Sequence, residues 1–238
     1  MRILIFQHLA VEHAGVFADF WREAGHQMKI VELDEGEPIP ALEDFDLLTV
    51  MGGPMDVWQE DIHPWLVPEK AAIRRWVREL ERPYLGICLG HQLLADALGG
   101  KVSLMARPEV GLAKVELTAS GRGDPLFNGL EPTLETLQWH GAEVSVLPDH
   151  AHVLAANAAC PIQAMRWGNR AYGFQYHMEI TDRTVGDWER IPEYKASLEK
   201  ALGIEEAAGL SSAVASRLAA FGQAAQRINA NFMASIGR

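Results

Sequence analysis

The sequence predicts an α/β fold in which a mostly parallel central sheet is flanked by helices, with an antiparallel extension and a C-terminal helix. Two observations lead to this prediction. The first hundred residues alternate short apolar runs with amphipathic helical stretches, which is the pattern of strand–helix units in a parallel sheet. The residues that follow contain short strand-like runs joined by turns, which is typical of antiparallel pairing.

In the first half, strands are expected wherever a short apolar run is bounded by polar or turn residues. These strands are residues 2–6, 28–33, 46–51 and 82–88. Helices are expected over residues 16–24, 69–80 and 91–98. The first helix ends at Gly25, because glycine readily takes the left-handed conformation that closes a helix.

The rest of the chain predicts shorter strands and then a helix. The strands are residues 102–104, 111–117, 143–147, 152–156, 162–167 and 170–176, with Gly168-Asn169 as a hairpin turn between the last two. Near the C-terminus one apolar helical stripe contains Val214, Leu218, Phe221, Ala225, Ile228 and Phe232. We expect this stripe to pack on the core, and docking of a partner helix is the alternative.

The composition narrows the classes of protein and ligand. The 238 residues predict a single domain over 1–238. The sequence has 21 Lys and Arg and 32 Asp and Glu, so its net charge is −11. Nucleic acids and anionic membranes would repel this charge, so neither is expected as a partner. Two cysteines make no disulfide framework, and no apolar run reaches the roughly 18 residues that span a bilayer. The apolar start is too short for a signal peptide, so we expect a cytoplasmic protein that binds a small molecule.

One segment has the pattern of a nucleophile elbow, with cysteine in the place of the usual serine. An apolar strand leads into Gly86-Ile-Cys-Leu-Gly90, and a helix follows. Glycines two residues before and after Cys88 suit a tight strand-to-helix turn that leaves no room for a Cβ atom. The turn places the sulfur at a helix N-terminus, where the dipole favours the thiolate. From these five residues alone, a buried structural cysteine is an equal alternative.

A thiolate nucleophile needs a proton carrier, and His177 is the candidate among nine histidines. His177 closes an apolar strand, and Glu179 follows two residues later. Residues i and i+2 of an extended chain project to the same side, so the carboxylate can accept a hydrogen bond from the imidazole and fix its tautomer. A structural histidine is the alternative, which the cysteine elbow makes less favourable.

Acyl chemistry also needs donors for the developing oxyanion. The N–H of Leu89, directly after the nucleophile, is the expected first donor. The turn Met51-Gly-Gly-Pro54 closes a neighbouring strand, and its glycines let the backbone approach a substrate closely. This turn is therefore the candidate for the second donor, and an ordinary turn is the alternative.

Three stretches resemble the motifs of the class I glutamine amidotransferase family, in the family's order: Met51-Gly-Gly-Pro-Met55, Gly86-Ile-Cys-Leu-Gly-His-Gln92 and Gly173-Phe-Gln-Tyr-His-Met-Glu179. The resemblance covers about residues 1–185 and leaves 186–238 as a C-terminal helical extension. It is closest to stand-alone proteins similar to the glutaminase domain of GMP synthase, and γ-glutamyl peptidases share the architecture. The resemblance implies a flavodoxin-like arrangement of the sheet.

The resemblance also implies hydrolysis of the side-chain amide of glutamine to glutamate and ammonia, with no cofactor and no metal. Cys88 would attack the amide carbon to form a thioester, with the N–H groups of Gly53 and Leu89 holding the oxyanion. His177 would protonate the departing ammonia and then activate water, while Glu179 holds His177. A separate synthase subunit would accept the ammonia.

The expected substrate-binding residues are Gln92, Gly52 and His140. Gln92 resembles a family residue that helps to bind glutamine, although it could face solvent; His140 could equally serve a turn. The sequence departs from the family at Met178, where proline is frequent, and at Ala142, where an aspartate is common. The second departure makes a different γ-glutamyl substrate more plausible.

Two other functions remain open at this point. One is a γ-glutamyl peptidase or hydrolase without an ammonia acceptor, and the other is a catalytically silent binding or regulatory protein of the same fold. His150 and His152 share one face of a strand but lack a third ligand, so zinc is not expected. Cys160 has no acid–base neighbour in the sequence and is expected to be a packing residue.

Overall fold

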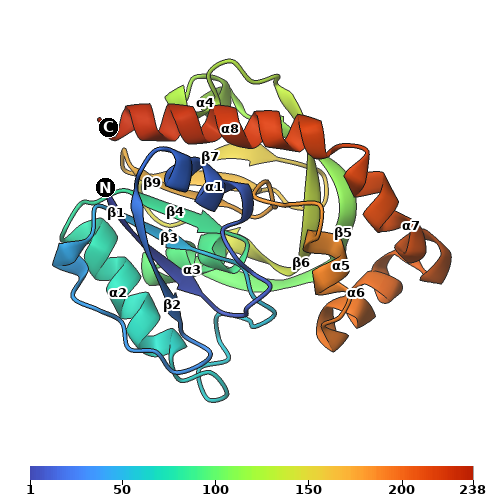
Figure 1. Ribbon diagram of the computed structural model, residues 1–238, viewed down its shortest axis with the longest axis horizontal. Helices are drawn as coiled ribbons and strands as arrows, with labels where there is room; N and C mark the ends of the chain where they lie inside the picture. The colour runs from blue at the N-terminus through green and yellow to red at the C-terminus, as the bar shows by residue number, and fades with distance from the viewer. Residues whose placement is uncertain (238) are drawn as a thin grey trace.

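The computed structural model describes residues 1–237, which contain one mixed sheet of nine strands in the order β2-β1-β3-β4-β9-β8-β7-β5-β6 (Figure 1). The strands are β1 (Arg2–Gln7), β2 (Gln27–Glu32), β3 (Leu47–Val50), β4 (Tyr84–Ile87), β5 (Lys101–Leu117), β6 (Thr133–Val146), β7 (Ala151–Ala156), β8 (Ala164–Trp167) and β9 (Ala171–Phe174). The α-helices are α1 (Gly15–Glu23), α2 (Leu66–Arg78), α3 (Leu89–Ala97), α4 (Ala119–Arg122), α5 (Thr184–Trp188), α6 (Pro192–Leu202), α7 (Ile204–Ala215) and α8 (Leu218–Ser235). Two 3₁₀ turns cover Leu42–Asp44 and Pro125–Phe127.

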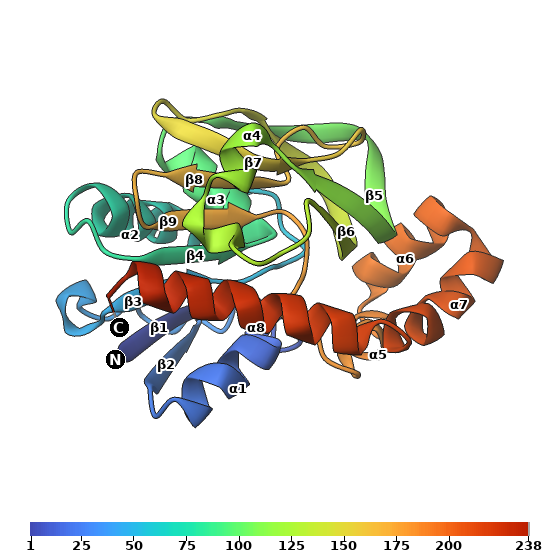
Figure 2. The same ribbon diagram turned by 90° about the horizontal axis from the view of Figure 1, so that it is seen from above.

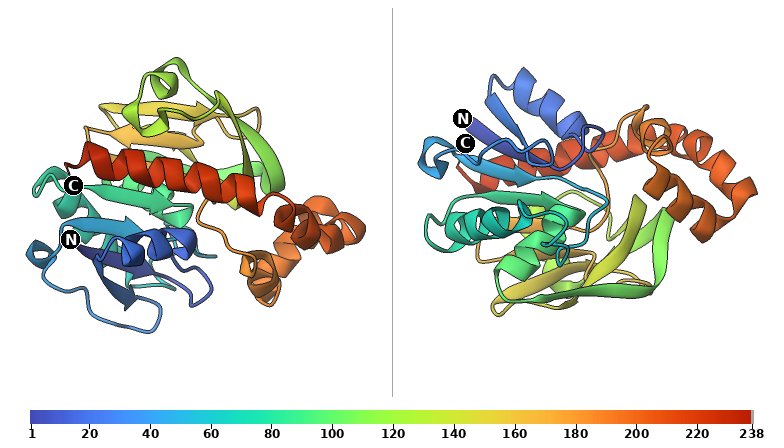
Figure 3. Two further views of the ribbon diagram at one scale, coloured as in Figure 1. Left: turned by 45° about the horizontal axis from the view of Figure 1, so that its top comes forward. Right: turned by 90° about the horizontal axis from the view of Figure 1, so that it is seen from below.

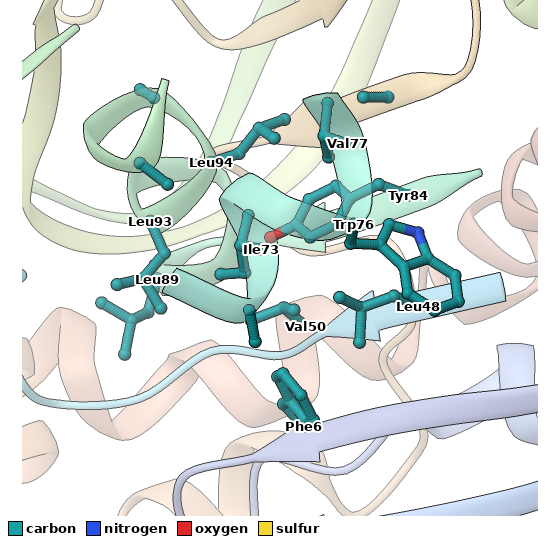
Figure 4. Close-up of a cluster of buried hydrophobic side chains, with 14 of the residues drawn as sticks. Phe6, Leu48, Val50, Ile73, Trp76, Val77, Tyr84, Leu89, Leu93 and Leu94 are labelled. Carbon is teal, nitrogen blue, oxygen red and sulfur yellow. The ribbon is translucent and has the colours of Figure 1, made fainter. Parts of the chain in front are cut away.

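Strands β2, β1, β3, β4 and β9 are parallel neighbours, and helices cover both of their faces (Figure 2). Successive β1 residues point to opposite faces, so Leu4 and Phe6 pack with α2 and α3, whereas Ile3 and Ile5 pack with α1 and α8. Figure 4 shows part of the first cluster, in which Trp76 of α2 lies beside Leu48. Apolar residues on both faces explain why these strands appear as continuous apolar runs in the sequence.

Strands β9, β8, β7, β5 and β6 form the antiparallel half. The predicted hairpin joins β8 to β9, and Gly168 has a φ of 57° in its turn. Two strand predictions were wrong: residues 102–104 and 111–117 belong to one strand, β5, and β6 begins at Thr133 rather than at residue 143. The β5–β6 register shifts between Leu104 and Glu109. Pro108, which cannot donate to a ladder, lies within that irregularity, and the strand continues on both sides of it.

The C-terminal segment is more divided than the sequence predicted. The apolar stripe runs over two helices, with Val214 on α7 and the others on α8. Phe221, Ala225, Ile228 and Phe232 are buried, so the expectation of core packing is confirmed. Helix α8 crosses the sheet, and α5, α6 and α7 form a lobe at one end of the molecule (Figure 3).

The predicted fold class is confirmed: the sheet has a parallel core, an antiparallel extension and helices at the C-terminus. No helix within residues 1–237 combines the length and the apolar character needed to cross a membrane. The carboxyl ends of β1, β3, β4 and β9 meet at one edge of the sheet, because these strands are parallel. Ligands of open α/β sheets bind at this edge, and the candidate site lies there.

Candidate active site

Cys88 occupies a strained turn between β4 and α3. Its φ of 52° and ψ of −105° are unusual for a residue other than glycine. A Cβ atom on Gly86 would lie 2.5 Å from the carbonyl oxygen of Gly90, and one on Gly90 would lie 2.1 Å from that of Val50. The expected lack of room for a Cβ at these two glycines is therefore confirmed. The Cys88 N–H donates to the Phe174 carbonyl at 2.7 Å, which ties the turn to β9.

His177 and Glu179 form a buried pair directly after β9. The Nδ1 atom of His177 lies 2.7 Å from Oε1 of Glu179, and because a carboxylate accepts, Nδ1 is the donor. The other oxygen, Oε2, accepts the Met178 N–H at 2.9 Å. Trp188 packs edge-on against the imidazole, with ring centroids 4.6 Å apart. The ring is therefore fixed in one orientation and one tautomer.

The charge of the His177 imidazole is also coupled to Cys88. Burial alone would lower the pKa of His177, but the Glu179 charge, then Cys88 by charge and by hydrogen bonding, hold this pKa well above its usual value. The structure thus brings together the three side chains that the sequence singled out. A cationic imidazole that is stabilised by a carboxylate can support a thiolate beside it.

Two backbone N–H groups beside Cys88 make no hydrogen bond to any residue within 1–237. They belong to Leu89, the first residue of α3, and to Gly53, in the turn after β3. A Cβ on Gly53 would lie 3.1 Å from Cδ2 of Leu89, so the turn and the elbow are adjacent. This is the arrangement that an oxyanion hole requires, with two free donors near one nucleophile.

A cavity of about 150 Å³ opens beside Cys88 and Gly53. Its walls come from the β3 turn, α3, β6 and α6, and include Gln92, His140 and Tyr194. The Nε2 atom of Gln92 donates to the Ala142 carbonyl at 3.1 Å and to Oε1 of Gln175 at 3.0 Å. Both amide hydrogens of Gln92 are therefore occupied within the protein.

The other two expected substrate-binding residues differ in position. His140 lies on the cavity wall, with Nδ1 2.9 Å from the Ala142 carbonyl oxygen and Nε2 3.1 Å from Oε1 of Gln138. Gly52 lies beside His177 instead, since a Cβ at this position would be 3.3 Å from Cε1 of that imidazole. Both nitrogens of His140 are held by the fold, which leaves its ring surface to face the cavity.

Sequence reasoning missed Glu12, a buried carboxylate beside His177. Tyr194 of α6 donates to Oε1 of Glu12 at 2.5 Å, whereas Oε2 has no partner within residues 1–237. Burial raises the pKa of Glu12, and His177 opposes that rise. Glu12 follows β1, so a search for polar residues after each buried parallel strand would have found it. Glu12, His177 and Glu179 offer ligand atoms within 4.8 Å of one another, but the His177–Glu179 hydrogen bond already uses two of these groups.

Gln175 was also missed, although it lies inside one of the sequence motifs. Its Nε2 atom lies 3.8 Å from the Cys88 sulfur, within reach of a weak hydrogen bond. Cys160 has no such surroundings: burial raises its pKa to about 12, and no disulfide joins it to Cys88. The two cysteines are therefore chemically distinct.

Comparisons with known proteins find related sequences over most of the chain. The family described as glutamine amidotransferase class-I matches residues 16–187. The glutamine amidotransferase-like protein YfeJ of Salmonella typhimurium is 32% identical over 195 residues, which cover 78% of each chain. The glutamine-hydrolysing GMP synthase subunit of Sulfurisphaera tokodaii is 34% identical over 151 residues, 63% of this chain and 76% of the relative.

Solved structures show the same architecture. A glutamine amidotransferase from Thermotoga maritima superposes with a TM-score of 0.86 and 26% identity, covering 100% of this chain and 99% of that one. A glutamine amido transferase from Methylobacillus flagellatus gives a TM-score of 0.88 and 26% identity, with coverage of 100% and 96%. The similarity therefore extends over the helices of the C-terminal lobe as well as the sheet.

Proposed function

This chain belongs to the class I glutamine amidotransferase family, and on that premise we propose that it hydrolyses the side-chain amide of glutamine to glutamate and ammonia. The observation that carries the proposal is the strained turn at Cys88 together with the His177–Glu179 hydrogen bond, in which His177 interacts electrostatically with Cys88. Two free N–H groups beside the sulfur support the same reaction.

The reaction begins when the Cys88 thiolate attacks the amide carbon of the substrate, with His177 carrying the thiol proton. The amide oxygen becomes an oxyanion that accepts hydrogen bonds from Gly53 and Leu89. His177 then gives its proton to the leaving nitrogen, ammonia departs, and a glutamyl thioester remains on Cys88. Glu179 stabilises the imidazolium through the 2.7 Å hydrogen bond in both directions of proton transfer.

A water molecule completes the cycle. His177 takes a proton from this water, hydroxide adds to the thioester carbon, and the C–S bond breaks to release glutamate. The thiolate leaves beside the protonated His177, which restores the starting ion pair, and the new carboxyl group of glutamate releases its proton to solvent. No oxidant, metal or cofactor takes part in this sequence of steps.

We further propose that a separate polypeptide uses the ammonia. The name of the Sulfurisphaera tokodaii relative describes a glutamine-hydrolysing subunit of GMP synthase, which is one part of a larger enzyme. We expect the protein to work in the cytoplasm, since its two cysteines are unpaired and one of them must stay reduced.

A γ-glutamyl peptidase or hydrolase is the second candidate. Ala142 stands where an aspartate is common in the family, and the carboxylates of Asp56 and Glu193 lie on the cavity wall instead. A changed set of charged groups around the amino-acid end of the substrate favours a changed γ-glutamyl substrate.

The test is ammonia and glutamate release by the purified protein, with Cys88→Ala and Cys160→Ala as a matched pair. The proposal expects release from glutamine in the wild type and in Cys160→Ala, and none in Cys88→Ala. Release of glutamate and the second amino acid from γ-glutamyl dipeptides, without release of ammonia from glutamine, would establish the second candidate. If neither substrate is hydrolysed and a glutamine-like electrophile does not label Cys88, the protein is a binding protein.

A further inference from the structure

A second histidine–carboxylate pair lies beneath the turn that carries Gly53. His8 follows β1 and Glu69 lies in the first turn of α2, and both side chains are fully buried. Nε2 of His8 is 2.8 Å from Oε1 of Glu69, and Nδ1 is 2.9 Å from the carbonyl oxygen of Gly52. Trp65 stacks on the imidazole with ring centroids 5.3 Å apart and an angle of 15°. The mechanism above uses neither member of this pair.

The direction of these hydrogen bonds follows from their acceptors. A carbonyl oxygen can only accept, so Nδ1 of His8 donates to Gly52. Burial alone would lower the pKa of His8, but the Glu69 charge and the hydrogen bonds to Glu69 and Gly52 raise it. The hydrogen bond to a carbonyl therefore places a proton on Nδ1, and the pair presents a fixed donor to the turn.

A donor on the Gly52 carbonyl determines where the next N–H points. The peptide bond between Gly52 and Gly53 is planar and trans, so its C=O and N–H face opposite ways. With the oxygen held by His8, the Gly53 N–H is directed away from His8, and Gly53 lies on the cavity wall with Cys88. Two successive glycines would otherwise let this peptide rotate at little cost, because neither has a Cβ.

We propose that His8 and Glu69 are positioning residues for the reaction: they hold the Gly52–Gly53 peptide so that its N–H faces the oxyanion. The inference rests on the proposed function and deepens it. A peptide fixed before the substrate arrives needs no reorganisation when charge develops, which is the main advantage of an oxyanion hole. The pair should therefore act on kcat and leave the KM for the substrate nearly unchanged.

Two isosteric amide variants separate the two hydrogen bonds of His8. His8→Asn places an N–H near the position of Nδ1 and keeps the donor to Gly52, whereas His8→Gln places one near Nε2 and keeps only the contact with Glu69. Loss of a whole oxyanion donor costs about 10²–10³ in kcat. We expect His8→Gln to lose about 10- to 100-fold in kcat with KM within about threefold, and His8→Asn to retain most of the activity.

A second readout detects the oxyanion hole itself. Glutamate γ-semialdehyde adds to the Cys88 thiolate and forms a hemithioacetal, whose oxygen occupies the place of the oxyanion without a leaving group. The thiolate sulfur bonds to the aldehyde carbon, and the oxygen takes up the proton or the hydrogen bonds of the hole. We expect the affinity of this inhibitor to fall in His8→Gln by the same factor as kcat, while labelling of Cys88 by a glutamine-like electrophile continues.

Equal losses of kcat in the two amide variants, or unchanged inhibition by the semialdehyde in His8→Gln, would overturn the proposal. If an amide variant fails to fold, Glu69→Gln replaces it: the neutral side chain still accepts from Nε2, and the expected kcat lies between those of His8→Asn and His8→Gln. Unchanged kcat and inhibitor affinity in Glu69→Gln would then reject the role of Glu69. The proposed function fails separately, through a wild type that releases nothing from glutamine or γ-glutamyl peptides.

Discussion

The parallel and antiparallel halves of the sheet contribute different things to the site. The parallel half supplies Cys88, the Gly53 turn and, after its border strand β9, His177 with Glu179. The antiparallel half and α6 supply walls of the cavity, including Trp139, His140 and Glu193. The groups proposed to act on the bond thus follow parallel strands, whereas the cavity walls come from both halves, with the antiparallel half and α6 forming the side away from the elbow.

This difference teaches how reaction and recognition can vary independently. Parallel strands that are buried on both faces are rigid, and their carboxyl ends hold the reacting groups in a constant geometry. The α6 wall is less constrained, because one side of this helix faces solvent, whereas the β6 residues at the cavity are buried on both faces. Substitutions of the residues that follow the parallel strands should change kcat. Substitutions in the β6 and α6 walls should change KM and substrate choice.

Replacing Cys88 should have the largest effect. Cys88→Ala removes the nucleophile, and we expect the rate of ammonia release to fall by about 10⁴-fold or more. Cys160→Ala, the matched variant of the other buried cysteine, should keep activity within about twofold. Activity in Cys88→Ala above one tenth of the wild type would break the comparison, because the parallel half would then not supply the reacting group.

Replacing Glu179 should have the next largest effect. Glu179→Gln removes the charge that stabilises the imidazolium, and we expect kcat to fall by about 10²–10⁴-fold. The same change should lower the pKa of His177, because a negative charge that raised this pKa is lost. The pH–rate limb that reports His177 should therefore move to lower pH. A variant with reduced kcat but an unmoved pH profile would indicate that Glu179 has only a structural role.

A substitution in α6 should affect recognition rather than chemistry. Glu193→Gln removes a carboxylate from the cavity wall, and we expect KM for glutamine to rise by about three- to tenfold with kcat unchanged. Glu199→Gln, on the same helix but away from the cavity, should leave both constants unchanged. A fall in kcat without a change in KM for Glu193→Gln would remove the distinction between the two halves.

Features that depend on residues close together in the chain could be predicted from the sequence, whereas contacts between distant segments could not. The elbow, the His177–Glu179 hydrogen bond and the parallel strands depend on residues close together in the chain, and local spacing predicted them. The contacts of Glu12 with Tyr194 and of His8 with Glu69 join residues 182 and 61 positions apart. No local pattern encodes such pairs, because they follow from the packing of β1 against α2 and of the loop after β1 against α6. The unbroken course of β5 was missed because the polar residues between 104 and 111 give no apolar strand pattern, and pairing with β6 carries the strand across them with a register shift.

The border between the two halves of the sheet should make the protein less stable in acid. His91 of α3 packs against Gly173 of β9, and burial lowers the pKa of His91 to about 3. Below the ordinary value near 6.5, the unfolded chain binds a proton that the folded protein excludes, so stability falls as pH decreases from about 6.5 to 3. The contribution is about 1.4 kcal/mol per pH unit.

The measurement is the free energy of unfolding of the wild type and of His91→Gln between pH 7 and pH 4. Glutamine does not titrate, so the acid slope of the variant should be flatter by the contribution of one proton. If the free energy of unfolding depends on pH equally in the two proteins, the folded state accepts the proton on His91. The contact between α3 and β9 would then be less tightly packed than the structure shows.

The central claim is that Cys88 is a nucleophile inside a pocket for γ-glutamyl compounds. Its most direct test is peptide mass spectrometry after treatment of the wild type with a glutamine-like electrophile, with and without excess glutamine. We predict modification of Cys88 alone, protection by glutamine, and no modification of Cys160. Modification of Cys160, or of neither cysteine under conditions where the protein is folded, would contradict the account.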